Sequence, residues 1–174
     1  IVFTGSTGEL LRTALKEMGV IATRDCYLVT AGKCKPPNNK IKDPAIKHCR
    51  KFLIDDLIRV NPVVVVTLGA TALFSLTGKK KLSEERGSPR VINIESHTSS
   101  ASSEIVLIPT EHPQSILRDA DKFKLLFRDL QKAVDIARAG GVIPPKPVVD
   151  YRVVATEKDA EDFKTDLRGS KLLS

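Results

Sequence analysis

An unbroken apolar run, PVVVVTLG at residues 62–69, constrains the fold of this chain more than any other feature. It has the length of one strand and lacks the polar alternation that would leave one face in water. Such runs are typical of parallel strands that helices cover on both faces. Helical patterns flank it at residues 43–61, where Asp43 is expected to cap a helix with Pro44 at its first position, and at residues 70–78. The run therefore predicts an α/β fold with a buried parallel sheet.

The remainder of residues 1–139 also alternates between helical and extended patterns. Helical periodicity covers 7–19 and 121–138, and β-rich runs cover 26–31, 91–95 and 104–110. Loops are indicated at 32–43, in the basic segment 79–90, and in the serine-rich stretch between the last two strands, which suits a hairpin tip. This alternation predicts an α/β domain with a mostly parallel central sheet.

Residues 140–174 have a different character. GGVIPPKPVVD has linker composition, and we place the linker at 140–150. The patterns beyond it predict a strand, a helix and the start of another strand, which is too little to bury a core. We therefore expect residues 151–174 to be the beginning of a second domain, and the natural start of the chain to lie upstream of Ile1.

Charge and cysteine content narrow the class of protein. The net charge of +7 is carried by residues 1–140, because acidic and basic side chains balance in residues 141–174. A basic domain suggests a polyanionic partner such as nucleic acid. The sequence contains no apolar run long enough to span a membrane. Three cysteines do not make a disulfide framework, so a reducing cytoplasm is the expected location.

Four segments are placed to form a site: the glycine-rich start, the loop after 26–31, LGATA after the apolar run, and EHPQS after 104–110. Ligands of open parallel sheets bind beyond the carboxyl ends of the strands. Taken alone, His112 in EHPQS fits a turn residue that solvates a strand end better than a catalytic group, and both interpretations stay open. A phosphorylated small ligand at LGATA is a more remote alternative, because that turn lacks the glycine density of a phosphate loop.

The order of VFTGSTGELL, CYLVTAGKCKPPNN, PVVVVTLGATAL, RGSP and IPTEHPQSILR resembles the uracil-DNA glycosylase superfamily, over about residues 2–138. The resemblance is closest to the family-4, iron-sulfur type and its relatives fused to phage DNA polymerases. It implies a three-layer α/β/α domain at 1–139 with a short, mostly parallel sheet whose first strand is missing from this chain. The tail resembles the start of the 3′–5′ exonuclease domain of family A DNA polymerases.

The resemblance also implies roles for individual residues. His112 would donate a hydrogen bond to the uracil carbonyl as the base departs, in the manner of an oxyanion hole. Phe3 would stack on a base flipped out of the duplex, although a core phenylalanine is the alternative. Thr30 occupies the position of the asparagine that reads uracil in the family, and a hydroxyl cannot match both groups of the uracil edge. The backbone amides of Gln114 and Ser115 would meet a DNA phosphate.

The same resemblance aligns Cys34 and Cys49 with the last two cysteine ligands of the iron-sulfur type. A [4Fe-4S] cluster takes four thiolates, so two ligands are expected upstream of this chain. Cys26 has no counterpart among the ligands. Because Cys49 also lies on the apolar face of its helix, an ordinary buried cysteine is the alternative interpretation.

The basic segment contains Lys79, Lys80, Lys81, Arg86 and Arg90, and its RGSP matches a family segment. Contacts to the DNA backbone are one interpretation, and a solvated loop is the other. Phosphate contacts would make the affinity fall steeply with salt. The family's water-activating segment would lie before Ile1, and Glu9, in the first helix, is not expected to be the base.

We therefore predict a DNA glycosylase domain that hydrolyses the N-glycosidic bond of uracil or another damaged base, as part of a phage-type DNA polymerase. We expect its partner to be single- or double-stranded DNA and expect no membrane to be involved. Its expected location is the cytoplasm, which is the host cytoplasm if the protein is phage-encoded. The alternative is a non-catalytic DNA-binding module of the same fold attached to a polymerase.

Overall fold

A computed structural model describes residues 3, 5–34, 36, 41–97, 99–145 and 156–169 of the chain. It divides into two compact units, residues Ile1–Pro144 and Pro145–Ser174. Among the described helices, none combines the length and the hydropathy that crossing a membrane requires.

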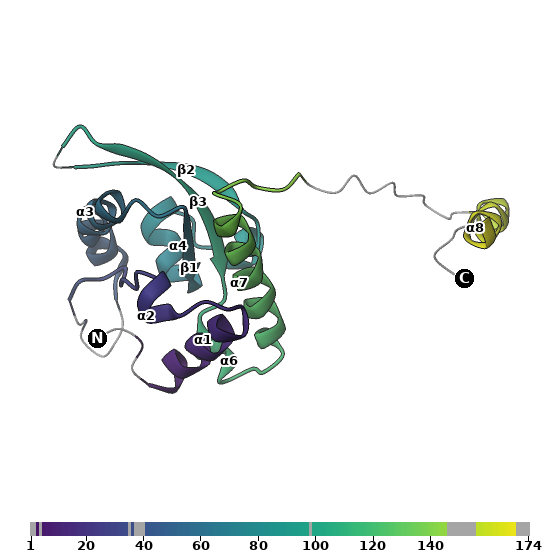
Figure 1. The fold of residues 1–174 in the computed structure, drawn as a ribbon, viewed down its shortest axis with the longest axis horizontal. Coiled ribbons are helices and arrows are strands. Elements are labelled where there is room, and N and C mark those ends of the chain that lie inside the picture. The colour runs from purple at the N-terminus through teal and green to yellow at the C-terminus, as the bar shows by residue number, and fades with distance from the viewer. Residues whose placement is uncertain are drawn as a thin grey trace. The chain divides into compact units, whose positions relative to one another are not determined.

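The first unit is built on a sheet of three strands in the order β1-β3-β2 (Figure 1). β1 (Val64–Leu68) and β3 (Ser102–Thr110) are parallel, with Val64 opposite Val106 and Leu68 opposite Thr110. β2 (Arg90–Glu95) is antiparallel to β3. The apolar run is therefore a strand with a parallel partner, as predicted, and the serine-rich stretch joins β2 to β3. We expected the β-rich residues 26–31 to form a strand, but they follow α2 without any strand assignment.

Seven described helices belong to the same unit as the sheet. They are α1 (Ser6–Glu17), α2 (Ala22–Asp25), α3 (Asp43–Val60), α4 (Gly69–Thr77), α5 (Leu82–Glu85), α6 (Pro113–Ile116) and α7 (Lys122–Arg138), and α8 (Glu157–Gly169) belongs to the second unit. The expectation that Asp43 caps α3 was wrong. The capping position is Lys42, which makes no side-chain capping bond, and the Asp43 carboxylate pairs with Lys80.

Helices cover both faces of the sheet, because the side chains of β3 alternate between two apolar clusters. Ile105 and Leu107 point toward a cluster that α3 and α4 complete. Val106 and Ile108 point to the opposite face, where α7 packs. A further cluster joins α1, α6 and α7 next to Leu68 of β1. Figure 1 shows the same arrangement, with α3 and α4 on one side of the sheet and α7 on the other. The fold is the predicted three-layer α/β/α.

The second unit contains α8, where a helix was predicted. Thr156 and Asp159 form a reciprocal cap at its start: the Thr156 amide donates to Asp159 Oδ2 at 2.9 Å, and the Asp159 amide donates to Thr156 Oγ1 at 3.2 Å. The predicted strands on either side of this helix, apart from Thr156, and residues 146–150 of the predicted 140–150 linker lie outside the described residues.

Candidate functional site

His112 lies at the edge of the sheet where the two parallel strands end. It is the N-cap of α6, and its Nδ1 accepts a hydrogen bond from the Gln114 amide at 3.1 Å. Pro113 follows at the first helical position, where no amide hydrogen is needed. Because Nδ1 is an acceptor, the neutral ring carries its proton on Nε2 and can donate it to a ligand. Partial burial lowers the pKa of His112 below its ordinary value of 6.5, which favours this neutral form.

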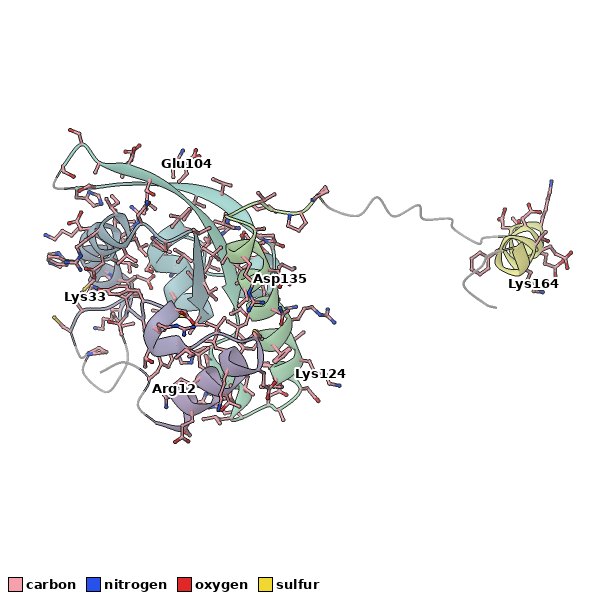
Figure 2. The ribbon with its side chains drawn as sticks, viewed as in Figure 1. Arg12, Lys33, Glu104, Lys124, Asp135 and Lys164 are labelled. Carbon is pink, nitrogen blue, oxygen red and sulfur yellow. The ribbon has the colours of Figure 1, made fainter. Side chains whose placement is uncertain are left out.

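Phe3 lies beside His112, although the two residues are far apart in the sequence. The ring centroids are 5.9 Å apart, with an interplanar angle of 30°. Phe3 has a left-handed backbone (φ 59°), and its carbonyl accepts a hydrogen bond from Arg12 Nη1 at 2.8 Å. The side chain of Arg12 on α1 is labelled in Figure 2. A Cβ at Gly8 would lie 1.7 Å from the Phe3 oxygen, so only glycine fits there. A strained residue held by such contacts is typical of a functional site.

Gly69 packs directly against the side chain of His112. It follows β1 directly and has a φ of +85°, which favours glycine. A Cβ at this position would lie 3.0 Å from His112 Cβ. The turn LGATA therefore brings the backbone as close to the histidine as glycine allows.

Thr30 is exposed in the extended chain that follows α2. Its hydroxyl donates to the Gly32 carbonyl at 2.7 Å. A threonine hydroxyl has one hydrogen, so this bond leaves Thr30 only lone pairs with which to contact a ligand.

Cys34 and Cys49 are brought close together by the loop before α3. The amide of Lys33, the residue before Cys34, donates to Cys49 Sγ at 3.5 Å. Lys33, labelled in Figure 2, also pairs with Asp56 of α3 at 2.5 Å, which fastens the loop to that helix. Cys34 is exposed and Cys49 is buried. An exposed thiol beside a second thiol that accepts an amide hydrogen bond suits cluster ligation, because hydrogen bonds to sulfur tune such clusters.

Cys26 lies elsewhere, half-buried against the cluster that α1 and α7 form. Burial raises the pKa of its thiol, and the nearby Asp25 carboxylate adds to the rise. Among the described residues, no group of three or more His, Cys, Asp or Glu side chains could hold a metal ion. The described residues therefore contain no complete set of metal ligands.

The predicted DNA-binding cations all have acidic partners inside the protein. The pairs are Lys79–Glu85 at 2.5 Å, Lys81–Glu84 at 2.9 Å and Arg86–Asp129 at 3.0 Å, with Lys80–Asp43 and Arg90–Glu85 in contact as well. The three lysines remain more than half exposed. Exposed pairs contribute only about 0–1 kcal/mol, so a phosphate can replace the carboxylate at small cost. Arg86 differs, because its partner is buried.

The amides of Gln114 and Ser115 are not free, contrary to expectation. The first donates to His112 Nδ1 and the second to the His112 carbonyl at 2.8 Å. The Ser115 hydroxyl lies 2.7 Å from the same carbonyl. A turn this short satisfies its own amides, so a contact of these two residues with DNA would involve their side chains.

The sequence interpretation singled out the LGATA turn without naming Gly69, and it missed Asp129. Asp129 lies on α7 among buried apolar residues and is itself 1% exposed. Its spacing of three from Leu126 and four from Ala133 puts a carboxylate on the apolar face of the helix, a signal that the sequence carries.

Comparisons with known proteins show which family the chain resembles in sequence. The family model for the uracil DNA glycosylase superfamily matches residues 1–134. A type-4 uracil-DNA glycosylase of Thermotoga maritima is 35% identical over 144 residues, which are 80% of this chain and 70% of that protein. The type-4 enzyme of Sulfurisphaera tokodaii is 27% identical over 86% of this chain and 66% of its own length. A DNA polymerase of Bacillus phage SP01 is 24% identical over 129 residues, which are 74% of this chain and 13% of the polymerase.

Proposed function

The chain belongs to the uracil DNA glycosylase superfamily, and from that premise we propose that it is a glycosylase domain that hydrolyses the N-glycosidic bond of uracil in DNA. The observation that carries the proposal is His112, held with Nδ1 as an acceptor and Nε2–H as a donor next to an aromatic ring. The described residues place this donor at the carboxyl edge of the parallel strands, where ligands of such sheets bind.

The proposed reaction breaks the bond between C1′ of the deoxyribose and the base nitrogen. The bonding electron pair leaves with the base, and negative charge develops on its carbonyl oxygens. Nε2–H of His112 donates to one of these oxygens, and a donor of this kind contributes about 10²–10³ in rate. Water adds at C1′ and gives up a proton. We assign the group that takes this proton to none of the described residues.

Phe3 supports the base once it has left the duplex. Stacking of a base on an aromatic ring contributes about 1–3 kcal/mol. The Arg12 bond and the close fit over Gly8 hold the backbone of Phe3 in place before the base arrives. We propose that this pre-organisation keeps the ring beside His112.

Thr30 favours a second candidate function, a DNA-binding module that does not excise uracil. Uracil presents a donor, N3–H, and an acceptor, O4, on the edge that must be read. The Thr30 hydroxyl already donates to Gly32 and can only accept from N3–H. Without a donor to O4, discrimination between uracil and cytosine is weaker.

Cys34 and Cys49 are the residues that would hold an iron-sulfur cluster, with two further thiolates from outside the described residues. When bound, the cluster would link the 32–34 loop covalently to α3. The test is iron content and visible absorbance of the full-length protein purified without oxygen. We expect Cys49→Ser to lose both, and iron retained at the wild-type amount would contradict the assignment.

We propose further that Lys79, Lys80 and Lys81 contact DNA phosphates, with the side chains of Gln114 and Ser115 at the site itself, whereas Arg86 stays bound to the buried Asp129. The domain would be covalently joined to exonuclease and polymerase domains that begin near residue 151, and it would act in the cytoplasm. Full-length protein incubated with uracil-containing single-stranded DNA should produce alkali-labile abasic sites. DNA binding without such sites would favour the binding module.

A further inference from the structure

A buried carboxylate joins three elements behind the proposed site. Asp129 lies on α7, and its side chain is 2% exposed. Its Oδ2 accepts hydrogen bonds from Thr110 Oγ1 at 2.7 Å and from Arg86 Nη1 at 3.0 Å. A carboxylate removed from water is costly unless it is paired and hydrogen-bonded. Asp129 meets that requirement only while α7, the end of β3 and the loop at Arg86 keep their mutual positions.

Gly87 shows how closely this loop is fitted. Its φ is +69°, and a Cβ there would lie 2.6 Å from Asp129 Oδ1. Its amide donates to the Pro109 carbonyl at 2.8 Å, and its own carbonyl accepts from Lys132 Nζ at 2.6 Å. The loop is therefore held by β3 through its amide, and by α7 through its carbonyl and the Arg86 side chain.

The same bonds fix the end of β3, from which His112 projects. Thr110 is the last residue of the strand, is fully buried, and lies opposite Leu68 of β1. Gly69 follows Leu68 and touches His112 from below. Thr110, which is bound to Asp129, and His112, which contacts Gly69, are separated in the chain by one residue, Glu111. A shift of Thr110 is therefore transmitted directly to the histidine.

Stability alone does not account for this pairing. Replacing a buried ion pair by well-packed apolar side chains is often neutral or stabilising, whereas a directional bond defines a position. We propose that Asp129 is a positioning residue: through Thr110 it sets the position of His112, and through Arg86 and Gly87 it sets the position of the adjoining loop. The inference rests on the proposed function, because His112 is given its role there.

Two variants of the full-length protein test the inference, with one matched control. Thr110→Val removes only the hydroxyl that reaches Asp129, and Asp129→Asn removes the charge. The control is Thr67→Val: Thr67 is also buried near the end of a strand, and its hydroxyl has no hydrogen-bond partner in the described part of the chain. The measurements are the single-turnover rate of uracil excision and the ring NMR resonances of His112, with His48 and His97 as internal references.

We expect both variants to shift the His112 resonances and to lower the single-turnover rate by about 10²-fold, because a misplacement of about 1 Å has that effect. The Thr67→Val control should change neither. If Asp129→Asn does not fold, Thr110→Val decides alone. Unshifted His112 resonances in folded Thr110→Val would overturn the inference. If the wild type excises no uracil, the proposed function fails, whereas the resonances still decide the position of His112.

Discussion

Gly69→Ala is the substitution that tests the site geometry most sharply. Alanine at a φ of +85° is strained, which costs about 1–2 kcal/mol. In addition, its Cβ would lie 3.0 Å from His112 Cβ, closer than such atoms normally approach. Because His112 Cβ is attached to the backbone, the relief must come from movement of His112 itself. We expect a small loss of stability together with a displaced donor.

Gly78 provides the matched control for this substitution. Its φ is +73°, nearly the same, but a Cβ there would have no neighbour within 4 Å. Gly78→Ala should therefore show the backbone cost of about 1–2 kcal/mol alone. Urea unfolding measures that cost in both variants, and single-turnover excision of uracil measures the position of His112.

Gly69→Ala should lose at least as much stability as Gly78→Ala, because it adds the contact with His112 to the same backbone cost, and the two variants should differ in excision rate. Gly69→Ala should lower the excision rate by up to about 10²-fold, and Gly78→Ala should leave it unchanged. Equal excision rates in Gly69→Ala and the wild type would refute the reasoning, because the contact with His112 would then have no influence on the donor.

Three further predictions follow from the same site. Burial lowers the pKa of His112, so uracil excision should persist below pH 6.5. At lower pH the excision rate should decline, because protonation of Nδ1 breaks the hydrogen bond from the Gln114 amide. A pH–rate profile that falls at 6.5 or above contradicts this prediction. Thr30→Asn should increase discrimination of uracil over cytosine, since an amide supplies both a donor and an acceptor; an unchanged ratio of the excision rates on uracil and cytosine would count against it. DNA affinity should fall steeply with salt, and Lys81→Gln should reduce the slope of log affinity against log salt by about one; an unchanged slope would remove Lys81 from the interface.

The parts of the fold that were predictable are those set by local pattern. The apolar run at 62–69 and the periodic stretch at 121–138 are long and regular, so β1 and α7 lie where they were expected. The strand expected at residues 26–31 was wrong, because a β-rich run forms a strand only when it finds a partner. The capping role of Asp43 failed because Lys80, distant in the sequence, takes its carboxylate.

The candidate site was predictable in its members and not in its contacts. His112, Phe3 and the LGATA turn were singled out from their segments, and the structure brings them together. The bond between Arg86 and Asp129 joins residues 43 positions apart, and no local pattern specifies such a pair. Likewise, the free amides expected at Gln114 and Ser115 are used by the turn itself, which only the backbone geometry reveals.

Release of free uracil from DNA is the most direct test of the central claim. Full-length wild-type protein and His112→Ala would be compared under single-turnover conditions on single-stranded DNA with one uracil, with binding of the uncleaved strand measured in parallel. We predict that the wild type releases uracil and leaves an equal amount of abasic sites, and that His112→Ala is about 10²–10³ slower with similar binding. Tight binding by the wild type with no uracil released would contradict the claim and identify a DNA-binding module.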